Sequence, residues 1–400
     1  MSLVLNTNVD SMVAQNSLTT SGTQLASALQ QLSTGLRVNT AADDAAGYAI
    51  AQGMTSQVNG LNQAAQNAND GVSLTQTASG AMTEITNDLQ TMRDLAVESL
   101  NATNSSNDRA DLNAQYSQLA ADVNNVAANT QFNGVNLLNG TFQGADFQIG
   151  ANAGQIISVA SIASTSTNAI GNYYTTAATT GAYADTTADA GNTASFDITV
   201  GTNASVTTGP VTITGDQTTD LANIASAINE SLGSSDGIVA TVDSTTGSIN
   251  LSTADGTAQN VTVALDASST STSSVNGLGL DTTYALGSAG GTSNNLSNTS
   301  VNSVDSSNLV LISIDNALQQ LATSSAQLGA YQNRFQAAIT GLNTDSTNLS
   351  NAKSSIVDTD YASATSSLSK AQILQQAGTA MVAQANTIPQ NILTLIQKLP

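Results

Sequence analysis

The chain has 400 residues, with 28 acidic and 7 basic side chains, so its formal net charge is −21 at pH 7. It contains no Cys and no His, which excludes a disulfide framework, a thiolate nucleophile, a Ser-His-Asp triad and metal sites built on His or Cys. The acidity disfavours nucleic-acid binding and no run of 18 apolar residues is present, so we expect no nucleic-acid partner, no membrane insertion, no metal and no cofactor.

The first expected element is a short amphipathic helix near the N-terminus. Its leucines follow a 4-3-4 spacing: Leu25, Leu29, Leu32 and Leu36. The same spacing recurs at the other end of the chain: Ile388, Ile392, Leu395 and Leu399. Each helix is marginal alone, so we predict that the two pair and that their incompletely covered apolar faces form a self-assembly surface. The alternative is that both termini fold back onto the body of the protein.

Arg37 follows the first helix in a connector rich in Gly, Asn and Thr. We predict that it lies where the terminal helices join the rest of the chain, with Asp43 or Asp44 as its partner; the alternative is a solvated cation. No cation precedes Arg37, so the N-terminus is not expected to be a secretory signal peptide.

Long helices with coiled-coil periodicity are expected next to both ends. Softer seams run through 61–92 and 112–126. The clearest seam has a strict 3-4 spacing through Leu311, Ile314, Leu318, Leu321, Ser325, Leu328, Gln332, Phe335, Ile339, Leu342, Ser346, Leu349, Lys353 and Ile356. This spacing needs a partner helix to cover it, which predicts a long antiparallel rod; an ordinary antiparallel bundle is the alternative.

The middle of the chain reads as β-rich. The dipeptides Asn133-Gly134 and Asn139-Gly140 predict tight turns, and strands are expected at 147–149 and 156–159. Further along, the pattern predicts strands at 196–200, 211–214, 238–242, 249–251 and 261–265, with a helix at 218–232 that ends near Gly233. The Ser/Thr-rich stretches 161–190 and 267–308 are expected to be linkers or irregular strands.

Charge and composition support a division of the chain into three parts. Residues 141–308 carry 13 acidic and no basic side chains, so all seven cations lie in the terminal blocks. The expected fold is α+β: a long antiparallel coiled-coil rod from the N- and C-terminal segments, a β-hairpin and a β-rich central insert. The expected domains are 1–44 plus 357–400 (terminal helices), 45–170 plus 305–356 (rod with hairpin) and 171–304 (β-rich insert).

Several motifs at both ends resemble bacterial flagellin. The N-terminal motifs are LASALQQLSTGL at 25–36, DDAAGYAI at 43–50, NANDGVSL at 67–74, LQTMRDLAV at 89–97 and TQFNG at 130–134. The C-terminal motifs are DTDYA at 358–362, AQILQQAG at 371–378 and AQANTIPQN at 383–391. These motifs lie in the right order within residues 1–160 and 309–400.

The resemblance implies a structural subunit that self-assembles into the bacterial flagellar filament, the passive propeller for swimming, and not an enzyme. It implies that copies of the chain form a homopolymer, with the terminal helices as the inner domain and the insert 171–304 facing outward. It also implies export to the extracellular filament without a cleavable signal peptide. The implied partners are the flagellar export apparatus, an export chaperone, the filament cap and hook-associated proteins. The alternatives are a hook-associated junction protein of the same family acting in few copies and, with less support, a secreted coiled-coil adhesin.

The resemblance also implies a patch on the rod that serves subunit packing and that a Toll-like receptor of animal hosts reads. It maps to Gln90, Arg93 and Leu95, with Gln115 on the neighbouring helix. Thr91 departs from the family pattern, which usually has Arg there, and Gln115 replaces the usual Glu. Because both changes remove charge, we expect weak receptor recognition.

Overall fold

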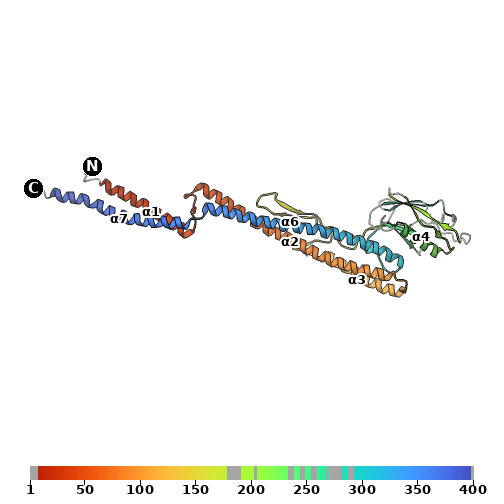
Figure 1. The fold of residues 1–400 in the computed structure, drawn as a ribbon. Coiled ribbons are helices and arrows are strands. Elements are labelled where there is room, and N and C mark those ends of the chain that lie inside the picture. Colours follow the sequence, from red (N-terminus) through yellow and green to blue (C-terminus); the bar gives the residue numbers. More distant parts are fainter. Residues whose placement is uncertain are drawn as a thin grey trace. The chain divides into compact units, whose positions relative to one another are not determined.

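The computed structural model describes residues 8–177, 191–201, 205–232, 238–243, 248–253, 259–266, 269, 282–286 and 292–397. It confirms the expected α+β class, with long helices from both ends of the chain and small antiparallel sheets from its middle (Figure 1). The chain divides into two compact units. The first comprises Met1–Ala68, Gln148–Ile156 and Ala337–Pro400, and the second Asn69–Phe147 and Ile157–Gln336. The three-part division drawn from the sequence stays a prediction.

The helices of the described chain are α1 (Val9–Thr34), α2 (Ala45–Ser99), α3 (Ser106–Asn129), α4 (Gln217–Leu232), α6 (Val304–Val357) and α7 (Tyr361–Gln397), with a short 3-10 helix η2 (Leu296–Asn298). Polar residues begin several of them. Asn8 accepts a hydrogen bond from the Ser11 amide at the start of α1, and Ser105 and Asp108 form a reciprocal capping box at α3. None of the helices described combines the length and the apolar character needed to cross a membrane.

In the first unit, α1 and α7 form an antiparallel pair (Figure 1). The start of α1 contacts the end of α7, where the Asn8 side chain donates to the Ala385 carbonyl oxygen over 2.9 Å. At the other end of the pair, Gly35 lies next to Tyr361. The terminal helices therefore pair as predicted, but the two predicted stripes do not meet. Residues 25–34 of α1 lie toward Tyr361 at the start of α7, and the stripe that begins at Ile388 follows Ala385, the residue that contacts the start of α1.

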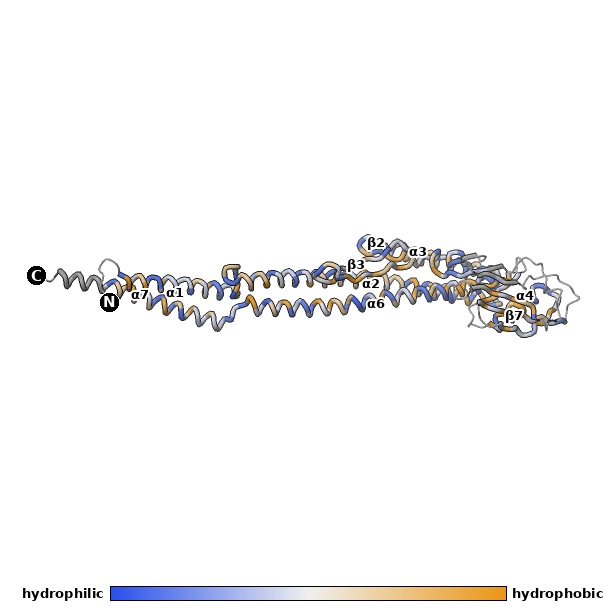
Figure 2. The backbone as a smooth tube through the Cα atoms, turned by 90° about the horizontal axis from the view of Figure 1, so that it is seen from above, coloured by the Kyte–Doolittle hydropathy of each residue, from blue (hydrophilic) through white to orange (hydrophobic). Residues whose placement is uncertain are grey.

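The long helices α2 and α6 are also antiparallel, and the predicted seam of α6 faces inward. None of its fourteen positions is exposed, and Ile314, Leu321, Leu328 and Phe335 are almost fully buried. On α2, Met82 meets this seam, since its sulfur accepts from the Ser325 hydroxyl over 3.7 Å, and Met82 and Leu89 are both fully buried. Apolar and polar positions alternate along both helices (Figure 2).

Short hairpins follow α3. Strands β1 (Gln131–Phe132) and β2 (Val135–Asn136) flank Asn133 and Gly134, whose positive φ values of 49° and 80° confirm the predicted turn. Strands β3 (Ala145–Gln148) and β4 (Ile156–Val159) pair with each other. Both lie close to their predicted positions.

The insert has two four-stranded antiparallel sheets and the helix α4 in its described part. One sheet has the order β10-β11-β5-β14, the other β13-β12-β7-β8, and β6 pairs with β9. The strands are β5 (Tyr173–Ala177), β6 (Thr193–Ala194), β7 (Phe196–Val200), β8 (Val206–Thr207), β9 (Val211–Thr212), β10 (Ile238–Asp243), β11 (Ser248–Thr253), β12 (Gln259–Leu265), β13 (Thr282–Leu286) and β14 (Thr292–Asn294).

The core of the insert lies between α4 and these strands. The apolar face predicted for α4 is buried, including Leu221, Ile224 and Ile228, against Phe196 and Ile198 of β7. The stretches 161–190 and 267–308 contain β5, β13 and β14, so strands rather than linkers occupy part of each. The predicted helix stop at Gly233 lies outside the described residues.

Candidate functional site

The terminal helix pair is held together by small and polar side chains. The buried positions of α1 are Ser11, Ser21 and Ala28, and those of α7 are Ala364, Ala371 and Ala385. Leu18 packs against Gly378, where even a Cβ atom would lie 3.2 Å from its Cδ1. The Ser11 hydroxyl donates to Asn386 Oδ1 over 2.8 Å. Small side chains let the helix backbones approach closely, but they bury little apolar surface.

Eight large apolar side chains of the pair are exposed to water instead. They are between 43% and 65% exposed, and they are Val9, Met12, Val13 and Leu29 around α1 and Tyr361, Ile373, Leu374 and Met381 on α7. Soluble monomers rarely leave so many large apolar side chains together in water. Exposed apolar side chains are unfavourable for a helix pair that stands alone in water. They are favourable for a pair whose surface packs against other helices.

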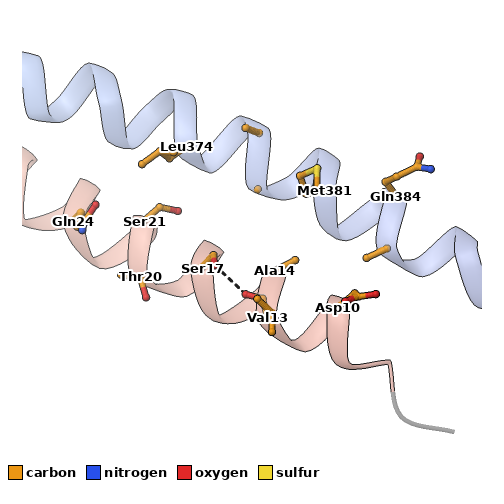
Figure 3. A pocket seen from close by; sticks show the side chains of 13 residues that line it. Asp10, Val13, Ala14, Ser17, Thr20, Ser21, Gln24, Leu374, Met381 and Gln384 are labelled. Atoms are coloured by element: carbon orange, nitrogen blue, oxygen red, sulfur yellow. Dashed lines mark hydrogen bonds between the residues drawn. The ribbon is translucent and has the colours of Figure 1, made fainter. Parts of the chain in front are cut away.

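A groove of about 810 Å³ runs between the two helices (Figure 3). Val13 and Ala14 line it from α1, and Leu374 and Met381 from α7. Its polar lining consists mainly of uncharged side chains such as Ser17 and Gln24, with Asp10 at one end. Such a lining suits apolar side chains and offers little to a charged ligand.

The predicted leucines of the N-terminal helix fall into three environments. Leu25 and Leu32 are half-buried, while Leu29 is half-exposed. Leu36 was expected in the helix, but this was wrong: α1 ends at Thr34 because Gly35 takes the left-handed conformation, with φ 73°, and its N–H bonds to the Gln31 carbonyl oxygen. Leu36 forms an isolated antiparallel bridge with Asp358.

At the C-terminus, Ile388, Ile392 and Leu395 lie within α7, and nothing is described of their side chains; Leu399 lies outside the described residues. The 4-3-4 pattern missed most of the exposed face. A signal was present in the sequence, because Val9, Met12 and Val13 have helical i, i+3, i+4 spacing and Leu374 and Met381 are seven residues apart.

Arg37 lies in the connector between α1 and α2, as predicted, but its expected partners were wrong. Its guanidinium Nη2 donates to the Ile356 carbonyl oxygen near the end of α6, and its amide donates to the Val357 carbonyl oxygen. Asp43 instead accepts hydrogen bonds from the amides of Asn39 and Thr40, which lower its pKa, with the Thr40 amide contributing most. Asp44 accepts from the Gly47 amide in the first turn of α2.

The predicted rod patch is partly buried. Arg93 Nε donates to Asp315 Oδ1 across 2.8 Å, and this hydrogen bond, with the charge of Asp315, raises the pKa of Arg93. Leu95 retains only 9% exposure. Gln90 on α2 and Gln115 on α3 are both exposed. The patch therefore offers two neutral amides and one partly neutralised cation to a partner.

Across the described residues, no group of three or more Asp or Glu side chains lies close enough together to hold a metal ion. What distinguishes the described surface is the apolar face of α1 and α7.

Comparison with known proteins assigns the family. Residues 5–143 match the family model described as the bacterial flagellin N-terminal helical region, and residues 311–396 match the C-terminal helical region. The B-type flagellin of Pseudomonas aeruginosa is 33% identical to this chain, with 99% of this chain and 100% of the relative covered. The chain belongs to the bacterial flagellin family. Flagellin B of Vibrio cholerae is also similar, at 37% identity over 99% of this chain and 100% of its own.

This flagellin is therefore a structural subunit that self-assembles into the bacterial flagellar filament. The full-length match to relatives named flagellins favours this function over that of a junction protein. A solved structure of FliC from Burkholderia pseudomallei shares 25% identity and covers 66% of this chain and 99% of its own, with a TM-score of 0.39. A TM-score of that size adds nothing to the assignment.

Proposed function

We propose that this flagellin polymerises through the outward apolar face of its terminal helix pair, which neighbouring subunits cover in the filament. The observation that carries the proposal is the packing of the pair: the fully buried positions of α1 and α7 are small residues, with Leu18 packed on Gly378, while eight large apolar side chains stay 43% to 65% exposed. Each large aliphatic side chain that becomes buried contributes about 1.5–3 kcal/mol, so covering this face supplies a strong drive for assembly. The predicted residues Leu25, Leu29 and Leu32 and the stripe from Ile388 to Leu399 belong to this proposed surface.

The test replaces two outward side chains in the full chain. Val13→Ser with Ile373→Ser removes apolar area from both helices without touching the small residues between them. We expect a much higher critical concentration for filament formation, measured by sedimentation and electron microscopy. Val135→Ser is the control, because Val135 is 50% exposed but lies on strand β2, outside both the terminal pair and the rod patch. Normal filaments from the double variant would contradict the proposal.

The proposal extends to the subunit's passage and partners. A chain with this apolar face needs cover before it assembles, which supports binding to an export chaperone, passage through the flagellar export apparatus and addition beneath a filament cap on top of hook-associated proteins. The filament would be extracellular and the chain would keep its N-terminus. The test compares the intact mass of the chain inside the cell with that of sheared filaments. A shorter secreted form would contradict the uncleaved export.

We also propose that the subunit is a passive polymer and not an enzyme. The support is chemical: the sequence has no His and no Cys, so an imidazole general base, a thiolate nucleophile and imidazole or thiolate metal ligands are missing. Hydrolytic activity that copurifies with the filament, and that persists when other exported hydrolases are inactivated by mutation, would contradict this.

A Toll-like receptor is proposed to read this flagellin weakly. Gln90, Arg93, Leu95 and Gln115 form the patch, and support comes from the burial of Leu95, the neutrality of Gln115 and the pairing of Arg93 with Asp315. A receptor-reporter cell assay tests it, with Thr91→Arg plus Gln115→Glu expected to raise the signal. Strong signalling by the unaltered subunit at low concentration would contradict the proposal.

The three-part division (1–44 plus 357–400, 45–170 plus 305–356, and 171–304) is also proposed, on the strength of the cation-free insert and the buried core around α4. Limited proteolysis should release the insert as a protected fragment. Protection that does not separate the insert from α2 and α6 would argue against these boundaries.

A further inference from the structure

The methionines of this chain occupy two opposite environments. The sequence has six, and five lie in the described residues. Met82 and Met92 are fully buried in the core of the long helices, and Met54 is partly buried. Met12 is 56% exposed and Met381 63% exposed. Both exposed methionines lie on the terminal pair, one on each helix.

The two exposed methionines belong to the outward apolar face. Met381 lines the groove between the helices, on the same side of α7 as Leu374 and across from Val13 (Figure 3). Met12 adjoins Val13 in sequence and follows the exposed Val9 by three residues, so these side chains share one stripe of α1. Their sulfurs are open to small solutes in the unassembled subunit and would be covered in the filament.

We propose that Met12 and Met381 form an oxidation-sensitive modification site: a peroxide converts them to methionine sulfoxide in the unassembled subunit, and this blocks polymerisation. The inference rests on the proposed role of the terminal face in assembly. In the reaction the thioether sulfur attacks one oxygen of hydrogen peroxide, an S–O bond forms and the O–O bond breaks. The proton of the attacked oxygen passes to the departing hydroxide, which leaves as water. Sulfur loses two electrons and the peroxide gains them.

The modification changes the property on which assembly depends. A thioether is apolar and fits an apolar surface, whereas a sulfoxide is a polar hydrogen-bond acceptor. Burying that oxygen among Val and Leu side chains leaves it without a donor, which is costly. Because assembly hides both sulfurs, oxidation acts before a subunit joins the filament, and enzymes of the methionine sulfoxide reductase class can reverse it.

The test treats the unassembled full-length chain with dilute hydrogen peroxide and locates the added oxygen by peptide mass spectrometry. We expect oxidation of Met12 and Met381 while Met82 and Met92 stay reduced. The critical concentration for seeded polymerisation should rise by at least about tenfold, and methionine sulfoxide reductase should restore it. Preformed filaments should resist the same treatment at both positions.

Variants separate this inference from the proposed function. Met12→Leu with Met381→Leu keeps apolar volume, so polymerisation should persist and should no longer respond to peroxide. Met54→Leu is the control, and its polymerisation should stay sensitive to peroxide.

If Val13→Ser with Ile373→Ser blocks assembly but oxidised wild-type subunits polymerise normally, the oxidation site is wrong and the assembly surface stands. If that apolar double variant polymerises normally, the assembly surface itself is wrong. The oxidation site would be overturned if the reductase failed to restore polymerisation. It would also be overturned if Met82 and Met92 were oxidised before Met12 and Met381.

Discussion

The ring of Phe335 on α6 occupies the space that a side chain at position 71 of α2 would need: a Cβ atom on Gly71 would lie 2.5 Å from Phe335 Cζ. Phe335 is fully buried, and its ring meets that of Phe147 from β3 edge-to-face at 5.2 Å between centroids. The glycine in the interior of this helix of 55 residues therefore leaves the space in which the aromatic ring packs. It fixes how α2, α6 and the β3 strand pack.

Gly71→Ala should destabilise the protein by about 1–3 kcal/mol, because the added methyl group forces the ring out of a packed site. Thermal unfolding followed by circular dichroism measures it. Gly80→Ala is the matched control on the same helix, since nothing lies within 4 Å of a Cβ there. The control should gain about 0.5–1 kcal/mol from the better helix propensity of alanine. A similar gain in stability for Gly71→Ala would show that the close packing of Phe335 on Gly71 does not matter for stability.

Asp220 is a fully buried carboxylate at the start of α4, and it should be essential to the insert. Its oxygens accept from the Thr214 amide and hydroxyl and from the Gly215 amide. Asp220→Asn puts an NH₂ group against these donors, so we expect a loss of about 1–3 kcal/mol in the stability of the insert. Hydrogen exchange across α4 and β9 measures this loss. Glu230→Gln, on the exposed side of the same helix, should change nothing.

Asp88 on α2 should lower the stability of the chain as the pH rises above the pKa of the unfolded state. Burial raises its pKa above 3.8, with the negative charges of Asp122 on α3 and Glu84 adding to the effect. A carboxyl whose folded pKa is raised costs stability once the pH exceeds its unfolded pKa, and costs nothing at low pH. Asp88→Asn should thus stabilise the chain by a few tenths of a kcal/mol at pH 7 and have no effect near pH 3.

Asp111→Asn on exposed α3 removes the same unit of charge, and it is the control for the general repulsion in a chain of net charge −21. The measurement is the midpoint of thermal unfolding at both pH values. An equal gain from both variants at pH 7 would show that the environment of Asp88 is not the cause.

Arg37 should hold the connector after α1 against the end of α6. Arg37→Ala removes the hydrogen bond to the Ile356 carbonyl oxygen, worth about 0.5–1.5 kcal/mol. We expect faster amide exchange at Arg37 and Thr359, whose N–H groups bond to Val357 and Gly35, and weaker polymerisation. Arg37→Lys keeps a donor and should show a smaller change. Unchanged exchange and polymerisation in the alanine variant would remove this role.

Periodicity predicted the elements whose burial repeats along one helix or strand. The α6 seam, the buried face of α4 and the strand at 196–200 all follow from local spacing of apolar residues. The pairing of β5 with β14 could not be predicted in this way, because Ser/Thr-rich strands carry little hydrophobic alternation.

The candidate site was predicted only in outline. That two terminal helices pair could be predicted from their amphipathic pattern, but the apolar stripes predicted the wrong register. The sequence also does not show which face turns inward when Ser and Ala fill the contact. The leucine spacing also predicted that α1 continues to Leu36, although glycine commonly ends a helix, as Gly35 does here. The partner of Arg37 was out of reach, since a backbone carbonyl leaves no trace in the side-chain pattern.

The hydrogen bond between Asn8 and Ala385 joins residues 377 positions apart. At typical synthesis rates of about 5–20 residues per second, the partner of α1 emerges from the ribosome roughly 20–75 s after α1 itself. During that interval α1 has the composition of a helix that is marginal alone. Each newly made subunit therefore spends most of its synthesis without the helix that α1 packs against, and the terminal pair can be completed only after residue 385 has emerged.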